Sequence, residues 1–293
     1  MFEQLGLIGC GLMGGSFALA LKRAGLVKRV VGYSKSPSTT ERARQLGVID
    51  VEAPSALLAV SGADIVVIAV PVAATEATLK AIKHLITPLT LVMDVGSTKR
   101  DVIDAARRAL REQVVAFVPA HPIAGREVSG VEHADADLYV NKTVVLTPVD
   151  RTLPSHVEKA AQVWTAIGAH VLQMSPEAHD AAFAAVSHLP HLIAFALMNA
   201  IATQEHGNDY LSLAGPGFRD FSRIAASDPQ VWRDILLSNR EELLAQAAIF
   251  REQLGELEAL IVKGDADGLG RLIEQASDTR ASWSLTASKP RKK

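Results

Sequence analysis

Two polar side chains at the ends of neighbouring predicted strands could carry out acid–base chemistry. His121 opens the segment His-Pro-Ile-Ala-Gly-Arg-Glu-Val-Ser-Gly at 121–130, and Ser97 lies in Asp-Val-Gly-Ser-Thr-Lys at 94–99. Each segment follows a β-branched run, and ligands of an open α/β sheet lie outside the carboxyl ends of its strands. A neutral imidazole there can accept a proton. The alternatives are that Ser97 or Thr98 caps the next helix and that His121 is a structural residue.

A glycine-rich turn predicts the binding site of a cofactor that could take part in that chemistry. Residues 9–14 read Gly-Cys-Gly-Leu-Met-Gly, directly after an apolar strand and at the start of a predicted helix. In this context the glycines allow a tight turn, close approach of the backbone to a pyrophosphate and close helix packing. The turn predicts a dinucleotide site, where His121 could accept a proton while a hydride leaves to nicotinamide. The predicted cofactor residues are Gly9, Gly11, Leu12, Met13 and Gly14.

The loop after the second predicted strand bears on the choice of cofactor. An acidic residue that binds the adenosine ribose is expected about 20 residues beyond the glycines. Ser34 stands there instead, followed by Lys35 and Ser36. A carboxylate would repel a 2′-phosphate, whereas hydroxyls and a cation could bind it through charge-assisted hydrogen bonds. We therefore expect NADP to be preferred, with NAD as a second cofactor; the alternative is a solvated loop that tolerates either.

Alternating strand and helix patterns predict how these residues are positioned. Up to residue 174 they predict an α/β fold with a Rossmann-type, doubly wound, mainly parallel sheet. Strand signals stop there, so we expect a dinucleotide-binding domain over 1–174 and an all-helical domain over 175–293. The predicted strands are 5–9, 29–33, 64–70, 90–95, 114–119, 143–147 and 170–173, and the predicted helices are 14–24, 73–85, 100–111, 154–167, 178–206, 231–262 and 266–277.

Long apolar helices in a second domain of this size would leave apolar faces uncovered in a monomer. A symmetric dimer is the usual remedy, so we expect a homodimer. The alternative is that these faces pack against the first domain.

Composition limits the classes of function. The 293 residues are 48% hydrophobic with a formal net charge of −2, so the chain can bury a large core and has no broad basic field for nucleic acid. The single cysteine, Cys10, excludes an intramolecular disulfide framework. Apolar windows are short or interrupted by proline and charge, and no signal-peptide pattern occurs. We expect a cytoplasmic protein with neither membrane nor nucleic-acid partners.

Six segments of the chain form a specific pattern. They read Gly-Cys-Gly-Leu-Met-Gly-Gly-Ser at 9–16, Asp-Val-Gly-Ser-Thr-Lys at 94–99, His-Pro-Ile-Ala-Gly at 121–125, Ser-His-Leu-Pro-His at 187–191, Gly-Phe-Arg-Asp-Phe-Ser-Arg-Ile-Ala at 217–225 and Asp-Pro-Gln-Val-Trp-Arg-Asp at 228–234. In this order they resemble the prephenate/arogenate (cyclohexadienyl) dehydrogenases of tyrosine biosynthesis. The resemblance implies oxidative decarboxylation of a cyclohexadienyl alcohol with hydride transfer to NAD(P). It also implies that the helical domain over 175–293 is the substrate and dimerisation domain. It implies that His121 deprotonates the C4 hydroxyl and that Ser97 orients His121 and that hydroxyl.

The same resemblance implies which residues bind the substrate. Arg223 matches a carboxylate-binding arginine, whose planar guanidinium suits bidentate capture. His188 and His191 resemble histidines that line the substrate and nicotinamide pocket, while Glu127 and Trp232 match residues beside it. Arg223 could instead be a surface residue and Trp232 a core residue. We expect no metal, because the two histidines have no further ligands at suitable spacing.

Two other functions compete with this interpretation. A β-hydroxyacid dehydrogenase shares the glycine-rich start, but its lysine base is missing between residues 176 and 207. A non-catalytic NAD(P)-binding sensor would keep the glycines without needing His121, Ser97 and Arg223. The choice between prephenate and arogenate stays open, because it depends on whether an acidic residue faces the substrate's side chain.

Overall fold

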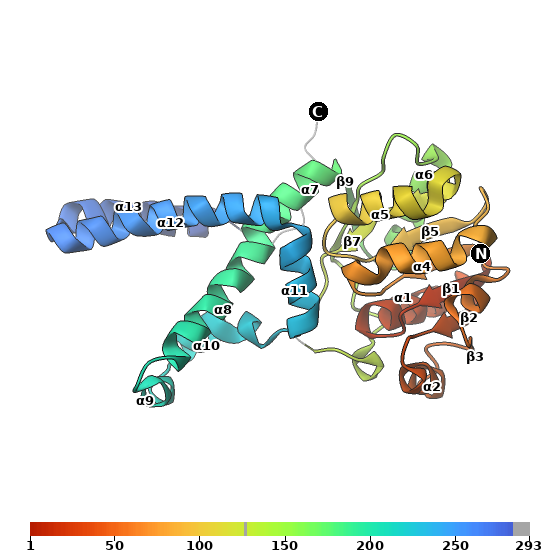
Figure 1. Cartoon of the computed structure of the whole chain (residues 1–293), viewed down its shortest axis with the longest axis horizontal. Helices are drawn as coiled ribbons and strands as arrows, with labels where there is room; N and C mark the ends of the chain where they lie inside the picture. The colour runs from red at the N-terminus through yellow and green to blue at the C-terminus, as the bar shows by residue number, and fades with distance from the viewer. Residues whose placement is uncertain (126–127, 284–293) are drawn as a thin grey trace.

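A six-stranded parallel sheet organises the first half of the chain. The computed structural model describes residues 1–125 and 128–283 and orders these strands β3-β2-β1-β4-β5-β6. This is the Rossmann-type order, which binds dinucleotides where the strand order reverses. The predicted doubly wound sheet is therefore confirmed (Figure 1). The strands are β1 (Phe2–Ile8), β2 (Val27–Tyr33), β3 (Val51–Glu52), β4 (Ile65–Ile68), β5 (Leu91–Asp94) and β6 (Phe117–Val118).

Helices cover both faces of this sheet, because its strands are apolar on both sides. Ile65 and Val67 of β4 belong to the core cluster that includes α1 and α6, whereas Val66 and Ile68 belong to the cluster that includes α4 and α5. The helices of this part are α1 (Leu12–Arg23), α2 (Pro37–Gln45), α3 (Ala56–Val60), α4 (Thr75–Ile82), α5 (Arg100–Leu110) and α6 (Pro154–Ala166), and its 3-10 turns are η1 (Val72–Ala74), η2 (Lys83–Leu85), η3 (Arg111–Ala116) and η4 (Val131–His133).

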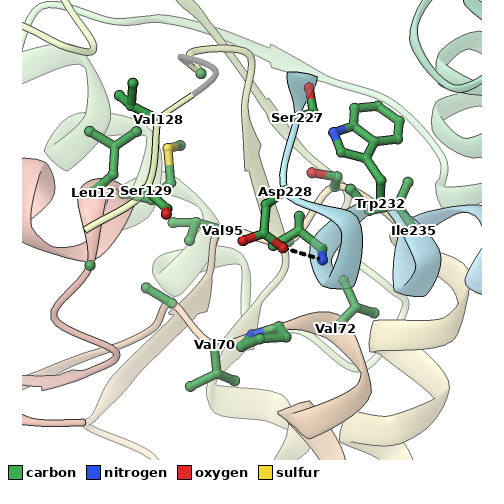
Figure 2. A pocket seen from close by; sticks show the side chains of 18 of the residues that line it. Leu12, Val70, Val72, Val95, Val128, Ser129, Ser227, Asp228, Trp232 and Ile235 are labelled. Carbon is green, nitrogen blue, oxygen red and sulfur yellow. Dashed lines mark hydrogen bonds between the residues drawn. The ribbon is translucent and has the colours of Figure 1, made fainter. Parts of the chain in front are cut away.

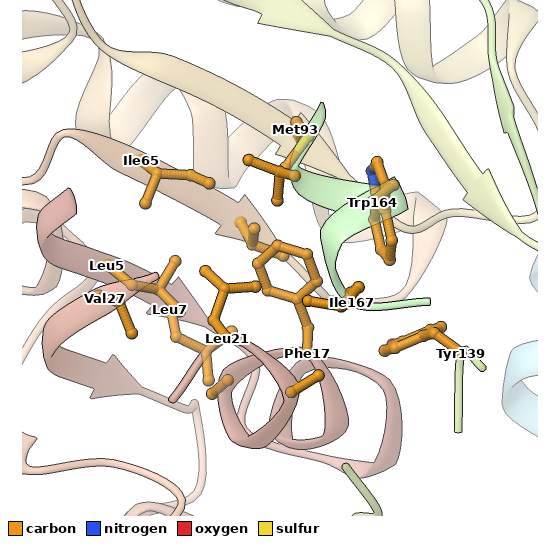
Figure 3. Packing of buried hydrophobic residues seen from close by; sticks show 14 of the residues in the cluster. Leu5, Leu7, Phe17, Leu21, Val27, Ile65, Met93, Tyr139, Trp164 and Ile167 are labelled. Atoms are coloured by element: carbon orange, nitrogen blue, oxygen red, sulfur yellow. The ribbon is translucent and has the colours of Figure 1, made fainter. Parts of the chain in front are cut away.

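An aromatic cluster ties the glycine turn to the core. The rings of Phe17 and Trp164 lie 4.8 Å apart, and Tyr139 packs edge-on against Trp164 at 5.2 Å (Figure 3). The Tyr139 hydroxyl donates a hydrogen bond of 2.6 Å to the carbonyl of Met13. The first turn of α1 is thus held by residues far along the chain.

A second, three-stranded sheet carries His121. It consists of β7 (Ala120–Pro122), β8 (Thr143–Leu146) and β9 (His170–Gln173), with β7 antiparallel and β9 parallel to β8. The strand predicted over 114–119 is therefore partly wrong, since it begins as the 3-10 turn η3 and contributes only Phe117–Val118 to the large sheet. Pro119, which has no amide hydrogen for a ladder, separates β6 from β7. His121 lies within β7 and not in a loop after a strand.

The remaining part is helical, as predicted, but two of the predicted helices are not regular α-helices throughout. The helix predicted over 178–206 contains a π-helical segment, and Pro190 just beyond it has no amide hydrogen for the helical ladder. The helix predicted over 231–262 breaks at Asn239, whose buried side chain binds groups outside the helix. The elements are α7 (Pro176–Phe183), η5 (Ala184–His188), α8 (Leu189–Ala202), α9 (Gly207–Ser212), α10 (Pro216–Ser222), η6 (Arg223–Ala226), α11 (Pro229–Ser238), α12 (Arg240–Lys263) and α13 (Ala266–Ser282).

The helices farthest from the sheets leave apolar side chains exposed. The α12–α13 hairpin projects away from the rest of the chain (Figure 1) and exposes Ile261, Val262 and Ile273. The continuous helical stretch Pro176–Ala202 is long and apolar enough to cross a membrane by length and composition, and 17% of its most apolar window is buried. This stretch is thus longer than the predicted short apolar windows, although Pro190 lies within it, as expected for an interrupted one.

Candidate active site

A cavity of about 570 Å³ lies at the carboxyl ends of β1, β4 and β5. One wall is formed by the glycine turn and by the segments that follow β4 and β5, including Ser97. The opposite wall comes from the helical part, where Asp228, Trp232 and Ile235 line it from the start and length of α11 (Figure 2). The cavity is therefore built by both parts of the chain, at the sheet edge where such folds bind ligands.

The glycine turn fits a dinucleotide. Gly9 has φ of +96°, and a Cβ there would lie 2.2 Å from the carbonyl oxygen of Ala69. A Cβ on Gly14 would lie 2.1 Å from the carbonyl oxygen of Gly9. A Cβ on Gly11, which lines the cavity, would meet no atom within 4 Å. The first and last glycines are thus required by packing, while Gly11 leaves room for a pyrophosphate at the N-terminus of α1.

Ser34, directly after β2, is hydrogen-bonded to the glycine turn. Its hydroxyl oxygen accepts a hydrogen bond of 2.9 Å from the amide of Cys10, while its own amide donates to the Thr40 hydroxyl over 3.1 Å. Lys35 and Ser36 are exposed. The end of β2 therefore presents a hydroxyl against the glycine turn, with a cation next to it.

A buried ion pair holds the backbone that leads to His121. The Lys99 Nζ atom lies 2.5 Å from Asp94 Oδ2 and donates a second hydrogen bond of 2.7 Å to the carbonyl of Ala120. Asp94 Oδ1 accepts from the amide of the same alanine over 3.0 Å. The backbone carbonyl and amide of Ala120, the residue before His121, are thus both held by this ion pair. Burial lowers the pKa of Lys99, although the neighbouring Asp94 counteracts that shift.

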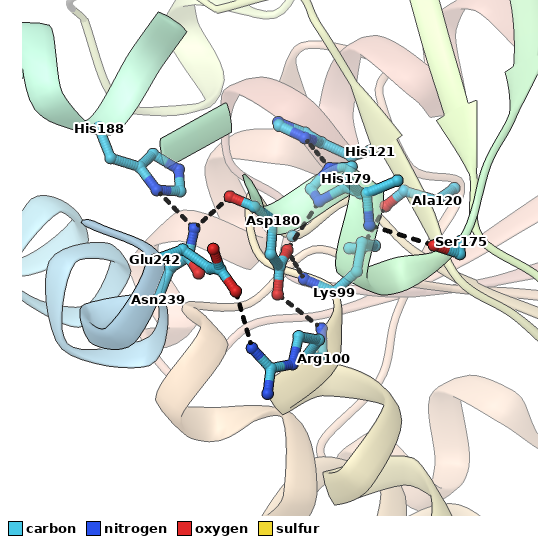
Figure 4. Close-up of polar contacts among 12 residues, drawn as sticks. Lys99, Arg100, Ala120, His121, Ser175, His179, Asp180, His188, Asn239 and Glu242 are labelled. Atoms are coloured by element: carbon cyan, nitrogen blue, oxygen red, sulfur yellow. Dashed lines mark hydrogen bonds and ion pairs between the residues drawn. The ribbon is translucent and has the colours of Figure 1, made fainter. Parts of the chain in front are cut away.

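His121 points one ring nitrogen at a second histidine. Its Nδ1 atom lies 2.8 Å from Nε2 of His179, and Nδ1 of His179 lies 2.7 Å from Oδ1 of Asp180 (Figure 4). Both helical residues come from the first turns of α7, whose N-terminus is capped by Ser175. Burial is the main cause that lowers the pKa of His121 well below its usual value, and nearby His179 and Lys99 lower it further. The imidazole of His121 is therefore neutral at physiological pH.

Ser97 lines the cavity, but it does not orient His121 directly. Within residues 1–125 and 128–283 the side-chain hydrogen bond of His121 goes to His179, and none joins His121 to Ser97. The alternative that Ser97 or Thr98 caps the next helix is wrong too. The first amides of α5 donate to the Asp180 carboxylate, from Lys99 over 2.8 Å and from Arg100 over 2.9 Å.

His188 is buried at the junction between α11 and α12. Its Nδ1 atom accepts a hydrogen bond of 3.1 Å from the Asn239 amide, which also donates to the carbonyl of Asp180 over 2.8 Å. Its Nε2 atom is buried and has no hydrogen-bond partner in the described chain. Burial lowers the pKa of His188 to about 4, so this ring is neutral as well.

His191 and Trp232 form a stacked pair. Their ring centroids lie 3.4 Å apart with 17° between the planes, and His191 Nδ1 donates to the carbonyl of Ser187 over 2.9 Å. Trp232 itself lines the cavity. The structure therefore brings these two sequence-predicted residues together, with Trp232 in the cavity wall and His191 stacked on it outside the lining.

The remaining predicted site residues are Arg223 and Glu127. Arg223 is exposed and begins η6, three residues before Ala226, which lines the cavity. Glu127 lies outside the described residues.

Sequence reasoning does not identify four residues of this region. Lys99 ends the motif at 94–99, and His179, Asp180 and Asn239 fall within predicted helices. One signal was available, because polar residues at the start of the helix after Ser175 stand next in sequence to the last strand. The sequence contains no signal that pairs Asn239 with His188.

Comparison with known proteins agrees with the site. The family model described as prephenate dehydrogenase, nucleotide-binding domain, matches residues 17–173, and that described as prephenate dehydrogenase, dimerization domain, matches residues 175–275. The prephenate dehydrogenase of Bacillus subtilis is 37% identical over 96% of this chain and 76% of its own length. The cyclohexadienyl dehydrogenase of Zymomonas mobilis is 33% identical over 96% of both chains.

Solved structures extend this similarity to the fold. Prephenate dehydrogenase from Aquifex aeolicus, in complex with hydroxyphenyl propionate and NAD+, is 36% identical with a TM-score of 0.90 over 96% of this chain and 98% of that chain. Synechocystis arogenate dehydrogenase is 29% identical with a TM-score of 0.80 over 96% of this chain and 100% of that chain. The glycine turn, the buried histidine and the helical wall thus occur in a chain that belongs to the prephenate dehydrogenase family.

Proposed function

We propose that this chain is an NAD(P)-dependent dehydrogenase that oxidatively decarboxylates prephenate, arogenate or both in tyrosine biosynthesis. The observation that carries the proposal is the cavity that joins the glycine turn and Ser97 on one wall to Trp232 on the other. A dinucleotide at the glycine turn extends along the first wall, and a small cyclic substrate fits between it and α11. Relatives named prephenate, cyclohexadienyl and arogenate dehydrogenases support this substrate class.

The chemistry that we assign to the site begins at the substrate's C4 hydroxyl. When bound, the nicotinamide supplies the acceptor for the hydride on C4. His121 takes the hydroxyl proton as the C4–O bond becomes a carbonyl, and Ser97 hydrogen-bonds to the same oxygen from the cavity wall. The bond from C1 to its carboxylate then breaks, carbon dioxide leaves and the electron pair completes the aromatic ring. The phenolate oxygen takes the proton back from His121, so no proton is consumed.

We assign substrate binding to the helical part. Arg223 would bind a substrate carboxylate, because a guanidinium offers two parallel donors. The buried Nε2 of His188 and the His191–Trp232 stack would border the ring. Glu127 is retained in this assignment on the resemblance alone.

NADP is proposed as the preferred cofactor, with NAD as the alternative. The support is the hydroxyl of Ser34 at the end of β2, where a carboxylate would repel the 2′-phosphate, together with the exposed Lys35 and Ser36. NAD remains the alternative because the Aquifex aeolicus relative was solved in complex with NAD+.

A cytoplasmic homodimer is proposed as the working form. Its support is the exposed apolar surface on α12 and α13 and the match of residues 175–275 to a dimerization domain. The little-buried stretch Pro176–Ala202 then packs in a protein interface. Sedimentation velocity tests this, because a monomer at micromolar concentration would contradict the dimer.

Turnover with two substrates and two cofactors tests the proposed activity. Purified enzyme is supplied with prephenate or L-arogenate, each with NAD+ or NADP+, and reduced cofactor, carbon dioxide and aromatic product are measured together. We expect equal amounts of the three products with at least one substrate and a higher kcat/KM with NADP+. Turnover of neither substrate would refute the function, and an equal or higher kcat/KM with NAD+ would refute the cofactor preference.

A further inference from the structure

Three side chains form a continuous hydrogen-bonded row that leads away from the reaction site. His121 on β7 contacts His179, and His179 contacts Asp180, both on α7. His179 and Asp180 are fully buried, with 0% and 1% of their surface exposed, and His121 is 8% exposed. Phe183 packs against the rings of both histidines, at centroid distances of 4.7 Å and 4.5 Å. We call these three residues the imidazole row.

The donors and acceptors of the row can be assigned from its far end. Asp180 Oδ1 already accepts from the amide of Lys99 and Oδ2 from that of Arg100, so this carboxyl acts as an acceptor. His179 must then donate from Nδ1, which leaves the lone pair on Nε2 of this neutral ring. His121 must in turn donate from Nδ1 to that lone pair. The Nε2 atom of His121 is therefore left as the acceptor.

The protonation states fit this assignment. Burial raises the pKa of Asp180, but the hydrogen bonds from His179, Arg100 and Lys99 outweigh it and keep the pKa below its usual value. Burial lowers the pKa of His179 more strongly than Asp180 raises it. The row therefore consists of one carboxylate and two neutral imidazoles.

From this geometry we infer that His179 and Asp180 are positioning residues that hold His121 in the tautomer required of a general base. The inference rests on the proposed function, because it names what orients the base of that reaction. A His121 ring protonated on Nε2 would offer a hydrogen where the substrate hydroxyl must lose one. The role assigned to Ser97 is then limited to the substrate oxygen.

The surroundings keep the far end of the row in place. The Asn239 amide donates to the Asp180 carbonyl, and the Arg100 guanidinium lies 3.3 Å from Glu242 on α12. The other titratable groups near the row are Lys99 and Asp94, which neutralise each other, and His188, whose Nδ1 is occupied by Asn239. In the part of the chain that the structure describes, none of these neighbours forms a hydrogen bond with the Nε2 atom of His121.

The test compares two variants of His179 with a remote control. His179→Leu removes the acceptor for His121 Nδ1, whereas His179→Gln keeps one in its amide oxygen. His84→Leu replaces an exposed histidine on η2 with the same side chain. Steady-state kinetics, cofactor affinity and thermal unfolding are measured for each dimeric enzyme.

We expect His179→Leu to lower kcat by about 10²-fold, the scale of one general-base contribution. The KM and the cofactor Kd should change little, because His179 does not line the cavity. His179→Gln should recover roughly a tenth or more of the lost rate, and His84→Leu should behave as wild type. If His179 had a purely structural role, His179→Leu would lower the thermal unfolding temperature, but it would not lower kcat while leaving KM unchanged. A folded His179→Leu with wild-type kcat would overturn the inference.

A spectroscopic measurement keeps the inference testable if His179→Leu fails to fold. Long-range ¹H–¹⁵N spectra of histidine-labelled wild type saturated with NADP+ report the tautomer of each ring, and His121→Asn assigns the signal. We expect His121 to carry its proton on Nδ1 in wild type and in His179→Gln. A proton on Nε2 in wild type would refute the row. If wild type turns over neither substrate, the proposed function is refuted. The tautomer of His121 then still shows whether the imidazole row has the inferred hydrogen-bond directions.

Discussion

The ammonium of Lys99 lies 2.5 Å from the carboxylate of Asp94, and both side chains are almost completely buried. The pair joins the end of β5 to the residue before His121, because Lys99 and Asp94 together bind the carbonyl and amide of Ala120. A buried pair of this kind does little for stability as a whole, but removing one partner leaves the other charge unpaired.

Lys99→Met should therefore destabilise the protein strongly. We expect the free energy of unfolding to fall by about 3–5 kcal/mol, the usual cost of an unpaired buried charge. Urea denaturation of each variant measures it. Asp94→Asn combined with Lys99→Met should recover part of the loss, because no unpaired charge is then buried. Arg107→Met, which breaks the exposed pair with Asp104, is the matched control and should cause a much smaller loss.

Activity should persist on the acid side of neutrality. The proposed base His121 would act when neutral, and burial lowers its pKa well below 6.5. We therefore expect kcat to be retained down through pH 6.5 and lost only as the pH falls toward the lowered pKa. The pH dependence of kcat at saturating substrate measures this. A half-maximal kcat at pH 6.5 or above would contradict it.

His121→Asn removes the proposed base while keeping a polar side chain. We expect kcat to fall by about 10²–10⁴-fold, the range of general acid–base contributions. Cofactor affinity should be unchanged, because the glycine turn and not His121 forms the dinucleotide wall. Near-wild-type turnover would remove His121 from the mechanism.

The fold could be predicted from the sequence where the signal is local. Residues 9–14 combine a predicted strand end, three glycines and a helix start within six positions, and the structure ends β1 at Ile8 and begins α1 at Leu12. The imidazole row could not be predicted in this way, because its hydrogen bonds join residues far apart in sequence. His121 and His179 are separated by 58 residues, and Lys99 and Asp180 by 81.

Asn239 illustrates how tertiary contacts override a local pattern. Apolar spacing over 231–262 predicts one helix, yet the chain leaves helical geometry at Asn239, with φ of −110° and ψ of 31°. The break places its amide between the carbonyl of Asp180 and the ring of His188. These hydrogen bonds satisfy buried groups on another helix, a gain that no pattern within 231–262 reveals.

Two glycine variants separate folding from cofactor binding. Gly14→Ala places a Cβ 2.1 Å from the carbonyl of Gly9 and should lower the thermal unfolding temperature. Gly11→Ala meets no atom within 4 Å, so it should fold as wild type but reduce dinucleotide affinity, since Gly11 lines the cavity. Thermal unfolding with and without NADP+ measures both effects. A Gly11→Ala enzyme with wild-type cofactor affinity would contradict the placement of the pyrophosphate.

Ser34→Asp should change the proposed cofactor preference from NADP to NAD. An aspartate at the end of β2 can still accept the hydrogen bond from the Cys10 amide that the Ser34 hydroxyl accepts now, so the turn should keep its shape. Its charge would repel the 2′-phosphate and bind the ribose hydroxyls of NAD instead. We expect kcat/KM for NADP+ to fall by about tenfold or more, equivalent to roughly 1.4 kcal/mol, while kcat/KM for NAD+ is unchanged or rises. Ser61→Asp, an exposed site on another loop, controls for the added charge. If Ser34→Asp lowers kcat/KM for both cofactors equally, this loop does not select the cofactor.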